Sequence, residues 1–500
     1  MKVRLLHPDR DADLEREVPP GSAALEQDLG LQAVLDAMAH RDPFVRERAR
    51  RELLLELDEP ETIAYRQDVL ADFLGHPELA RQLYDLAIAG IETRRKAWLI
   101  WLPNDSPEAQ RAKSVKMLRL LADVLRRLRR IADEHVNGLD SAGLKNLFAS
   151  VRTELDDAYL AELEGQLQEL EFKQGMLMTA ELGRGSRGTN YVLRRLRAGI
   201  LDRLTPELPS SSSFVVSKDD QYGLRALEEL RGRGLALVAN ALAQATDHVL
   251  AFFTVMRAEV AFYVGCINLF DELQARHAPV CRPLALSREG CSLAAEGLYD
   301  VALALHLDRP VVGNDVDADG KLLLVVTGAN EGGKSTFLRS VGLAQLMLQA
   351  GMFTPARVFH ASVASGLFTH FKREEDVTMA SGKLDEELQR MSEIVDGIRA
   401  GGLLLCNESF ASTNEAEGSE IARQLVSALV EEGIRVVYVT HMYDLAESLR
   451  GEELETSLFL RAERRPHGAR TFRIVPGEPE RTSYGADSFR RIFGPSPFIP

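Results

Sequence analysis

The residues best suited to chemistry form a glycine-rich segment in the second half of the chain, Gly328 to Ser335. Its sequence, Gly-Ala-Asn-Glu-Gly-Gly-Lys-Ser, fits the pattern GxxxxGK followed by Ser or Thr. Glycines at this spacing let backbone N–H groups curl around phosphate oxygens, and Lys334 can reach the β and γ phosphates. Ser335 can place its hydroxyl on Mg²⁺. The segment therefore predicts a phosphate-binding loop for a nucleoside triphosphate with magnesium.

Asn407 and Glu408 form a second candidate site, directly after the apolar segment 403–406. In ATPases with a phosphate loop, an acidic residue at the first of these places holds the metal, and a Glu can orient the water that attacks the γ phosphate. Asn407 can hydrogen-bond a metal-bound water but carries no charge, so we expect weaker Mg²⁺ binding. Glu408 is the candidate general base, although an Asn-Glu pair after a strand can also merely cap a loop.

His441 lies at the end of a third apolar segment, 435–440. A histidine there can sense the γ phosphate, because its charge and hydrogen bonds respond to a nearby anion. A single histidine is more often structural than catalytic. Its spacing alone leaves both roles equally open.

Alternating strands and helices are expected to bring these groups together. Short apolar runs predict buried strands at 322–327, 403–406 and 435–440. Helical patterns follow at 335–350 and 417–432, and each stops at a glycine. This alternation implies right-handed crossovers and a parallel sheet, which binds ligands at the carboxyl ends of its strands.

The first 300 residues have helical patterns, rich in Leu, Ala, Arg and Glu. Leucines at three- and four-residue spacing predict helices over 107–136 and 160–170. A stretch without proline predicts a longer helix over 224–275, and that length is more typical of an extended arm or lever than of a compact globule. Between them, glycines, prolines and four consecutive serines predict a loop-rich insertion at 175–217.

Together these patterns predict a multidomain fold, in which an α-helical core and lever region precedes an α/β domain with the phosphate loop. The three expected parts are an N-terminal segment at 1–22, the helical region at 23–304 and the α/β domain at 305–500. The most apolar long stretch, His248–Leu269, contains Arg257 and Glu259 near its middle. We therefore expect a buried helix there and no membrane span.

The overall charge excludes a protein that coats nucleic acid as a polycation. The chain has 60 Lys and Arg against 75 Asp and Glu, a formal net charge of −15. Local basic patches are compatible with that balance. Four cysteines without a CxxC pair fit a reducing cytoplasm, with neither a disulfide framework nor a zinc site. The N-terminus has no apolar signal core, so we expect a cytoplasmic protein.

One local basic cluster lies in the loop-rich insertion, without an acidic residue between its first and last members. It consists of Arg184, Arg187, Arg194, Arg195 and Arg197, with Tyr191 among them. The arginines could contact DNA phosphates, and the tyrosine could pack on a sugar or base. A solvated helix face with a loop explains the same residues equally well. Contacts of this kind would supply affinity rather than sequence reading.

The segment Thr327–Arg339 resembles the phosphate-loop region of the MutS family of DNA mismatch-repair ATPases. Other segments similar to the family follow in the family's order: Gln349–Ala356, Ser381-Gly-Lys383, Asn407 to Gly418, Thr440-His441 and Ser483-Tyr-Gly485. The resemblance is strong over residues 305–495. It is weaker upstream, where residues 60–70 look like the start of the family's helical core.

The resemblance implies an ABC-type ATPase head that binds ATP and Mg²⁺ and forms a homodimer with nucleotide between the two heads. The helical arms would be levers that connect the heads to duplex or branched DNA, with repair proteins as further candidate partners. The residues that match the family's nucleotide loop are Gly328, Asn330, Gly333, Lys334, Ser335 and Thr336. Arg473 would flank the adenine, with its guanidinium plane stacked on the base. Glu408 matches the catalytic glutamate and His441 the switch histidine. Ser335 and Asn407 match the family's residues on the metal-binding side of the nucleotide site.

The chain also departs from the family pattern. Asn407 replaces the usual Asp. Leu384 follows Ser381-Gly-Lys383, where the family usually supplies a Ser to the neighbouring subunit's γ phosphate, so that role is in doubt or passes to Ser381. The family's Phe-x-Glu base wedge occurs once, as Phe270-Asp-Glu272, but inside the predicted long helix. Because the chain begins near the family's helical core, we expect the N-terminal mismatch-reading and connector domains to be absent.

These features predict an ATPase whose ATP binding and hydrolysis control a DNA clamp in mismatch repair, or in a related repair or recombination process. Two alternatives stay open. Asn407 and Leu384 fit a nucleotide-gated clamp or scaffold with little turnover. The net charge of −15 and the misplaced wedge fit arms that grip a protein partner instead of DNA.

Overall fold

The computed structural model describes most of the chain and divides it into two compact units. The described residues are 1–55, 57–98, 106–173, 175–184, 188–194, 215–307, 309–373, 382–452, 455–465 and 469–480. Unit 1 comprises residues 1–3, 81–140 and 144–257, and unit 2 comprises residues 4–80, 141–143 and 258–500. The division expected from the sequence, with boundaries after residues 22 and 304, stays a prediction.

Unit 1 consists mainly of long helices, some of which begin or end in unit 2. They are α5 (Pro77–Trp98), α6 (Pro107–His135), α7 (Ala142–Glu154), α8 (Asp157–Glu169) and the first part of α10 (Gln221–Ala275). Leu118 of α6, Leu167 of α8 and Leu242 of α10 are buried in one apolar cluster. The most apolar 18-residue window of α10 is 78% buried, as in the core helix of a folded protein. The three predicted helices of this region are therefore confirmed.

A β-hairpin lies within the segment that the sequence predicted to be loop-rich. β1 (Leu177–Leu182) and β2 (Gly188–Arg194) pair antiparallel, with Leu177 opposite Arg194. These residues therefore form strands where the composition suggested loops, and the loop content of the rest of 175–217 stays a prediction. Thr189, Tyr191 and Val192 of β2 are residues that favour strands, and the glycine that suggested a loop, Gly183, directly follows β1.

Unit 2 contains the predicted parallel sheet, with one antiparallel strand at its edge. Its strands are β6 (Leu323–Gly328), β8 (Leu367–Phe371), β9 (Leu403–Asn407), β10 (Arg435–Val439), β11 (Ser457–Arg464) and β12 (Arg470–Pro476). Their order is β12-β11-β6-β10-β9-β8, and β12 alone in this sheet runs antiparallel to its neighbour. The three strands predicted from the apolar runs are confirmed as β6, β9 and β10.

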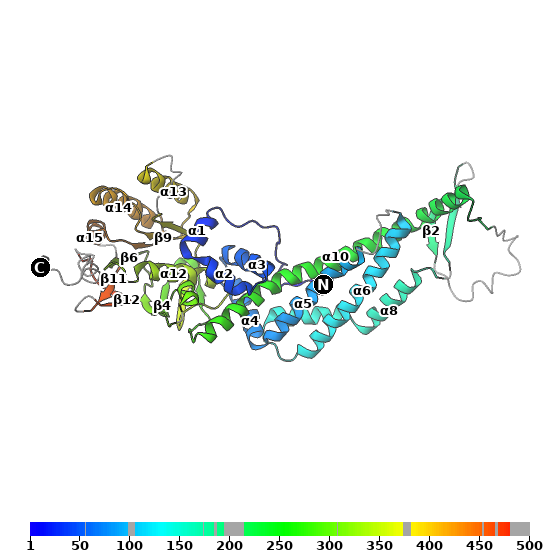
Figure 1. Ribbon diagram of the computed structural model, residues 1–500, viewed down its shortest axis with the longest axis horizontal. Helices are drawn as coiled ribbons and strands as arrows, with labels where there is room; N and C mark the ends of the chain where they lie inside the picture. The colour runs from blue at the N-terminus through cyan, green and yellow to red at the C-terminus, as the bar shows by residue number, and fades with distance from the viewer. Residues whose placement is uncertain are drawn as a thin grey trace. The chain divides into compact units, whose positions relative to one another are not determined.

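Helices cover both faces of this sheet (Figure 1). They are α12 (Lys334–Gln349), α13 (Lys383–Gly397), α14 (Glu415–Glu431) and α15 (Tyr443–Gly451). Successive strand residues point to opposite faces. Leu404 and Cys406 of β9 therefore join the apolar core under α13, α14 and α15. Leu405 points the other way, toward α12, where a Cβ on Gly342 would lie 2.7 Å from it.

A second, smaller sheet and a set of N-terminal helices complete unit 2. The sheet has the order β3-β7-β4-β5, with β3 (Leu284–Leu286), β4 (Leu293–Leu298), β5 (Asn314–Asp317) and β7 (Val358–Ser362). The helices are α1 (Ser22–Leu29), α2 (Leu31–Ala39), α3 (Pro43–Leu54), α4 (Pro60–Gly75) and α11 (Val301–His306), with the short 3-10 turn η2 (Arg288–Gly290). The sheet was not predicted from the sequence, whereas these helices lie almost entirely within the region 23–304 that was expected to be helical, although their bounds were not predicted.

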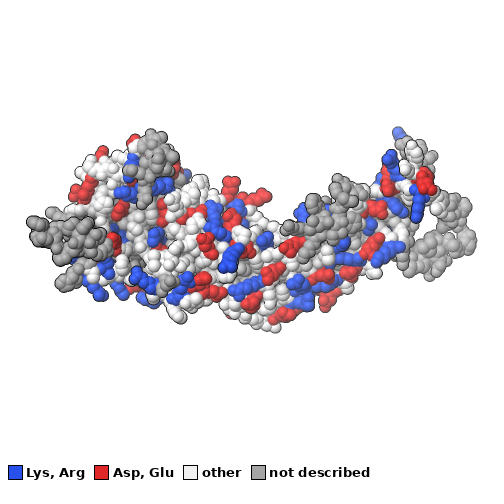
Figure 2. Space-filling model, viewed as in Figure 1, with Lys and Arg blue, Asp and Glu red and all other residues white. Residues whose placement is uncertain are grey.

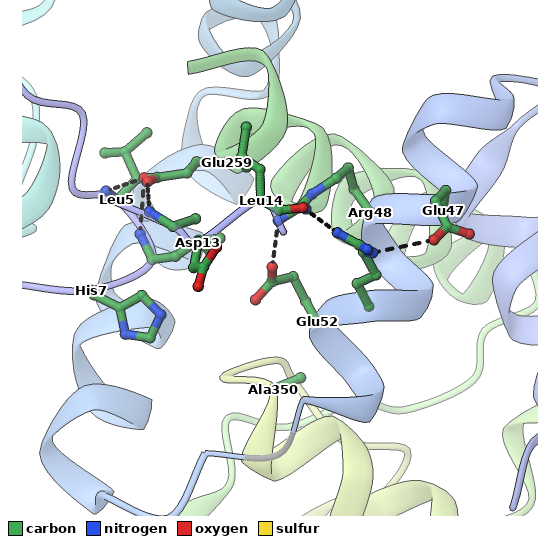
Figure 3. Close-up of polar contacts among 12 residues, drawn as sticks. Leu5, His7, Asp13, Leu14, Glu47, Arg48, Glu52, Glu259 and Ala350 are labelled. Carbon is green, nitrogen blue, oxygen red and sulfur yellow. Dashed lines mark hydrogen bonds and ion pairs between the residues drawn. The ribbon is translucent and has the colours of Figure 1, made fainter. Parts of the chain in front are cut away.

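The N-terminal segment of unit 2 is fastened to α10 by a buried carboxylate, Glu259 (Figure 3). Glu259 has no exposed surface. Its oxygens accept hydrogen bonds from the backbone N–H groups of Leu5, Leu6 and Ala12, at 2.6, 3.3 and 2.7 Å. Burial raises the pKa of Glu259 to about 7, although these three N–H groups favour the charged form. The backbone of residues 5–12 thus surrounds the carboxylate of Glu259, a residue that lies far later in the sequence.

Arg66 of α4 ties the same segment to α12. Its guanidinium is 2% exposed and donates to the carbonyl oxygen of Leu6 at 2.8 Å and to that of Ala350 at 3.4 Å. It also forms an ion pair with Glu52 of α3 at 3.0 Å. A buried charge is tolerated only when it is paired and hydrogen-bonded, and Arg66 meets both conditions. One side chain therefore contacts α3, the N-terminal segment and the residue that follows α12.

Candidate nucleotide-binding site

Three segments of unit 2 meet around one cavity at the carboxyl ends of β6, β9 and β10. The cavity has a volume of about 420 Å³. The residues that line it are Asn330, Glu331, Gly332, Gly333, Lys334, Ser335, Thr336, Glu408 and His441. Because β6, β10 and β9 are adjacent and parallel, the residues that follow them lie at one edge of the sheet. The predicted phosphate loop, Glu408 and His441 therefore share one site.

The loop after β6 has three residues in the left-handed region, the glycines Gly328 and Gly333 and the exposed Glu331 at a φ of 57°. Gly328 and Gly333 have φ angles of 103° and 94°, in the left-handed region that side chains disfavour. At Gly332, a Cβ would lie 2.6 Å from the Cβ of Ala462 and 2.8 Å from the carbonyl oxygen of Ala329. α12 begins directly after Gly333, without a side-chain capping hydrogen bond. The first N–H groups of that helix can therefore bind an anion.

Lys334 lies beside this loop with 6% of its surface exposed. Its ammonium donates hydrogen bonds to the carbonyl oxygens of Gly328 and Ala329, at 3.0 and 3.2 Å. Burial lowers the pKa of Lys334, while the charge of Glu408 acts in the opposite direction. A buried ammonium held mainly by neutral carbonyl groups favours a further anion, and the phosphates of a nucleotide would supply it.

Ser335 and Asn407 bring two oxygen atoms together where a metal ion would join the nucleotide. Ser335 Oγ donates a hydrogen bond to Asn407 Oδ1 at 2.9 Å. Oxygen ligands suit Mg²⁺, which also keeps waters and binds substrate phosphates. Among the residues that the structure describes, no three His, Cys, Asp or Glu side chains converge to hold a metal by themselves. The pair therefore fits a magnesium ion shared with a nucleotide, without a protein charge at Asn407.

Glu408 and His441 form a pair on the cavity wall. His441 Nδ1 lies 3.4 Å from Glu408 Oε1, and the two side chains are 40% and 30% exposed. The hydrogen bond from His441 lowers the pKa of Glu408, and the same contact raises the pKa of His441. An ionised carboxylate that water can reach is able to accept a proton from that water. The carboxylate favours the cationic form of the paired histidine, and a cationic imidazole is able to face a phosphate.

The structure places most of the predicted site residues together. All the predicted residues from Asn330 to Thr336 line the cavity, and Gly328 supplies a carbonyl oxygen to Lys334. Arg473 differs, because it is exposed on β12 and is not among the residues that line the cavity. Its predicted place beside an adenine stays a prediction.

Three other features singled out in the sequence lie away from the cavity or outside the described residues. Ser381 and Ser483-Tyr-Gly485 lie outside the described residues. Leu384 is partly buried against the apolar core under α13. Phe270 lies within α10, as predicted, and its ring packs against that of Phe353 with a centroid distance of 5.6 Å. That packing gives Phe270 a structural role.

Two residues of β12 next to the loop were missed by the sequence analysis. Arg470 Nε donates a hydrogen bond to the carbonyl oxygen of Asn330 at 3.2 Å. The backbone of Phe472 lies against the loop, where a Cβ on Gly333 would come 3.3 Å from the Phe472 carbonyl oxygen. β12 reaches the loop because it pairs with β11, which in turn pairs with β6. No local spacing rule reports a neighbour of that kind.

Two family models match the chain. Residues 58–276 match a model described as the MutS2 N-terminal domain, and residues 324–499 match one described as MutS domain V. The first covers most of the helices of unit 1, and the second begins in β6 and contains the whole cavity. Together the two models cover more than half of the 500 residues.

Proteins named DNA mismatch repair protein MutS are similar to this chain. The one from Chlorobaculum tepidum is 24% identical over 81% of this chain and 50% of its own length. Those from Desulfitobacterium hafniense and Thermotoga neapolitana are 26% and 32% identical, over 59% and 36% of this chain and 33% and 22% of their own lengths. The chain thus spans half or less of these relatives. The matches to two parts of one family, in the expected order and over most of the fold, show that this chain belongs to the MutS family.

Proposed function

We propose that this site binds ATP with Mg²⁺ and hydrolyses the γ phosphate bond, and that residues 305–500 form an ABC-type head. The observation that carries the proposal is the single cavity shared by the loop 328–336, Glu408 and His441. The match to MutS domain V supports it. By the same family resemblance, two heads form a homodimer with nucleotide between them.

Each residue has a separate task in the proposed reaction. The N–H groups at the start of α12 and the ammonium of Lys334 bind the phosphates. Ser335 and Asn407 would hold Mg²⁺, which neutralises phosphate charge when bound. Glu408 orients a water for attack and accepts its proton, and His441 responds to the presence of the γ phosphate through its contact with Glu408.

We propose that ATP controls DNA binding by the helical arms, in mismatch repair or a related repair process. The name of the relatives, DNA mismatch repair protein MutS, supports this, as does the match of residues 58–276. Of the basic cluster, Arg184 and Arg194 are exposed and Tyr191 is partly exposed on the hairpin, while Arg187, Arg195 and Arg197 lie outside the described residues. Figure 2 shows positive and negative side chains interspersed over the visible face, so DNA phosphates would need a local cluster of this kind.

One experiment tests both parts of the proposal. ATP hydrolysis is measured alone and with homoduplex, mismatched and branched DNA, and DNA binding is measured across a salt titration. The proposal expects Mg²⁺-dependent turnover that Lys334→Ala abolishes, and a DNA affinity that falls with salt. DNA binding without a salt dependence, or turnover that survives Lys334→Ala, would contradict it.

A second candidate function is a nucleotide-gated clamp or scaffold with little turnover, which grips a protein partner. The neutral Asn407 favours it, and so does the burial of Leu384 against the core, since that side chain is engaged within its own subunit. Nucleotide binding with negligible hydrolysis, and no salt-sensitive DNA binding, would favour this candidate. We also propose a cytoplasmic location, because the four cysteines are free and two of them are buried.

A further inference from the structure

The turn that carries Glu408 has an unusual backbone. Glu408 and Phe410 have φ angles of 54° and 60°, in the left-handed region where side chains are disfavoured. Neither is a glycine, an asparagine or an aspartate, the residues that adopt this conformation most readily. Two such residues within three positions persist only when surrounding contacts impose the conformation.

The residue between them, Ser409, is held from both neighbouring strands. It has no exposed surface, and its carbonyl oxygen accepts a hydrogen bond from the hydroxyl of Tyr438 at 2.8 Å. Its Oγ lies 2.7 Å from Nδ1 and 2.7 Å from the carbonyl oxygen of His370. His370 in β8 and Tyr438 in β10 are both register partners of Cys406 in β9. The turn is therefore hydrogen-bonded to both neighbouring strands, β8 and β10, directly after β9 ends.

His370 also supports the turn through its ring. The imidazole has no exposed surface and stacks on the ring of Phe410, with a centroid distance of 5.4 Å and an interplanar angle of 23°. Its Nε2 lies 3.0 Å from the carbonyl oxygen of Glu387 in α13. One histidine thus contacts two of the three residues of the turn and anchors them to a helix.

The protonation of His370 fits this anchoring. Burial, with the nearby charge of Arg390, lowers the pKa of His370 to about 4, so the ring is neutral at neutral pH. A neutral imidazole has one N–H group. Because the Glu387 carbonyl can only accept, that N–H is on Nε2, and the single proton of the Ser409 hydroxyl faces two acceptors of His370, Nδ1 and the backbone carbonyl oxygen. The hydroxyl is therefore directed toward His370 rather than toward the catalytic side.

We propose that His370 is a positioning residue for Glu408: through Ser409 and Phe410 it holds the left-handed turn that aims the carboxylate at the nucleotide cavity. The inference rests on the proposed ATPase function, but its structural part can be measured without turnover. His370 does not line the cavity, so it acts on the reaction only through the turn.

Four variants separate its contacts. His370→Phe keeps a ring and removes both hydrogen bonds. His370→Asn places an oxygen near the position of Nδ1, and His370→Gln places one nearer to Nε2. Ser409→Ala removes the hydroxyl alone. His360→Phe, in β7 of the small sheet, is the matched control, because His360 pairs with Asp319 and contacts neither the turn nor the cavity.

For His370→Phe we expect kcat for ATP to fall about 10- to 100-fold, as small displacements of catalytic groups do, with KM and nucleotide affinity changed less than about twofold. His370→Asn should recover part of the loss and His370→Gln should not, because the contact to Ser409 is the one that matters. Amide hydrogen exchange of residues 406–411 should become faster in His370→Phe and Ser409→Ala. The amide of Glu408, which donates to the Val439 carbonyl at 2.9 Å, is the most informative probe.

Two results would overturn the inference. The first is unchanged hydrogen exchange across the turn in His370→Phe, whatever the turnover. The second is a parallel loss of nucleotide affinity, kcat and melting temperature, which would make His370 a general core residue. If the unaltered chain binds ATP and does not hydrolyse it, the proposed hydrolysis fails, and the exchange measurement alone decides whether His370 holds the turn.

Discussion

The nucleotide cavity is built from two pieces of left-handed backbone that reach this conformation by different means. The loop after β6 uses glycines at Gly328 and Gly333, which adopt positive φ at no steric cost, and it has one exposed side chain in the same region, Glu331 at 57°. The turn after β9 uses Glu408 and Phe410, and each costs about 1–3 kcal/mol in that conformation. The left-handed side chain of the loop lies on the surface, whereas Phe410 of the turn is buried and depends on buried partners.

The difference follows from what each piece offers to a ligand. The loop offers backbone N–H groups, and a side chain at Gly332 would collide with Ala329 and Ala462. The turn offers a carboxylate, so glycine cannot replace Glu408, and the conformation has to be imposed from the core. α14 approaches so closely that a Cβ on Gly418 would lie 2.3 Å from the Phe410 carbonyl oxygen. A binding loop can therefore be encoded locally, while a turn that aims a catalytic side chain needs partners from other strands.

The largest expected effect comes from removing the group that the turn carries. Glu408→Ala should slow ATP hydrolysis by roughly 10²-fold or more, because a general base acts mainly in the transition state. Nucleotide affinity should stay nearly unchanged, since the loop and Lys334 are intact. Single-turnover hydrolysis and equilibrium ATP binding measure the two quantities. If turnover equals that of the unaltered chain, Glu408 is not the base.

Adding a side chain to the phosphate loop should weaken ATP binding, whereas removing Glu408 should slow turnover. Gly332→Ala would force the loop away from Ala462 and Ala329, and we expect ATP affinity to fall about tenfold, or about 1.4 kcal/mol. Gly75→Ala is a suitable control, because a Cβ there has no atom within 4 Å. Isothermal titration measures the change. Equal affinities in the two variants would show that the loop tolerates a side chain.

The comparison becomes sharper at Phe410, where the cost of the backbone can be isolated. Phe410→Ala and Phe410→Gly lose the same stacked ring, but only alanine keeps the left-handed penalty, so the glycine variant should be more stable by about 1 kcal/mol. At Phe337, the fourth residue of α12, the order should reverse, since glycine is worse than alanine in a helix, by about 1 kcal/mol in a helix interior. Denaturant unfolding of the four variants measures both differences. The same order at both positions would show that Phe410 carries no backbone penalty.

The smallest expected effect is on Mg²⁺ binding, at Asn407. Asn407→Asp adds a charge next to the Ser335 hydroxyl and should lower the Mg²⁺ concentration for half-maximal turnover severalfold. Asn414→Asp adds the same charge at the N-cap of α14, a position where both residues cap well, and should leave that concentration unchanged. A Mg²⁺ titration of single-turnover hydrolysis distinguishes them. If neither variant shifts the titration, the side chain at 407 has no part in binding the metal.

Local patterns predicted the elements of the cavity better than the contacts that support them. The apolar run 322–327 and the glycine pattern that follows were sufficient to predict β6, the loop and α12, because each signal lies within a few residues. The four-stranded sheet was missed, since β3 spans only Leu284–Leu286 and carries no alternation to detect. His370 was missed for a different reason. Its partner Ser409 lies 39 residues away, and only the pairing of β8 with β9 brings them together.

The hydrogen bonds from residues 5–12 to Glu259 also constrain the order in which the chain can fold during synthesis. Leu5 is 254 residues ahead of its partner Glu259, and Arg66 is 284 residues ahead of Ala350. At about 5–20 residues per second, the ribosome needs roughly 10–50 seconds to deliver Glu259 after Leu5. Unit 1 ends at Arg257, so its residues have all been made before Glu259 emerges, although Arg66, which binds the Leu6 carbonyl, is made much earlier. Unit 1 can therefore fold first, whereas the backbone N–H groups of Leu5, Leu6 and Ala12 have no carboxylate acceptor until Glu259 has been made.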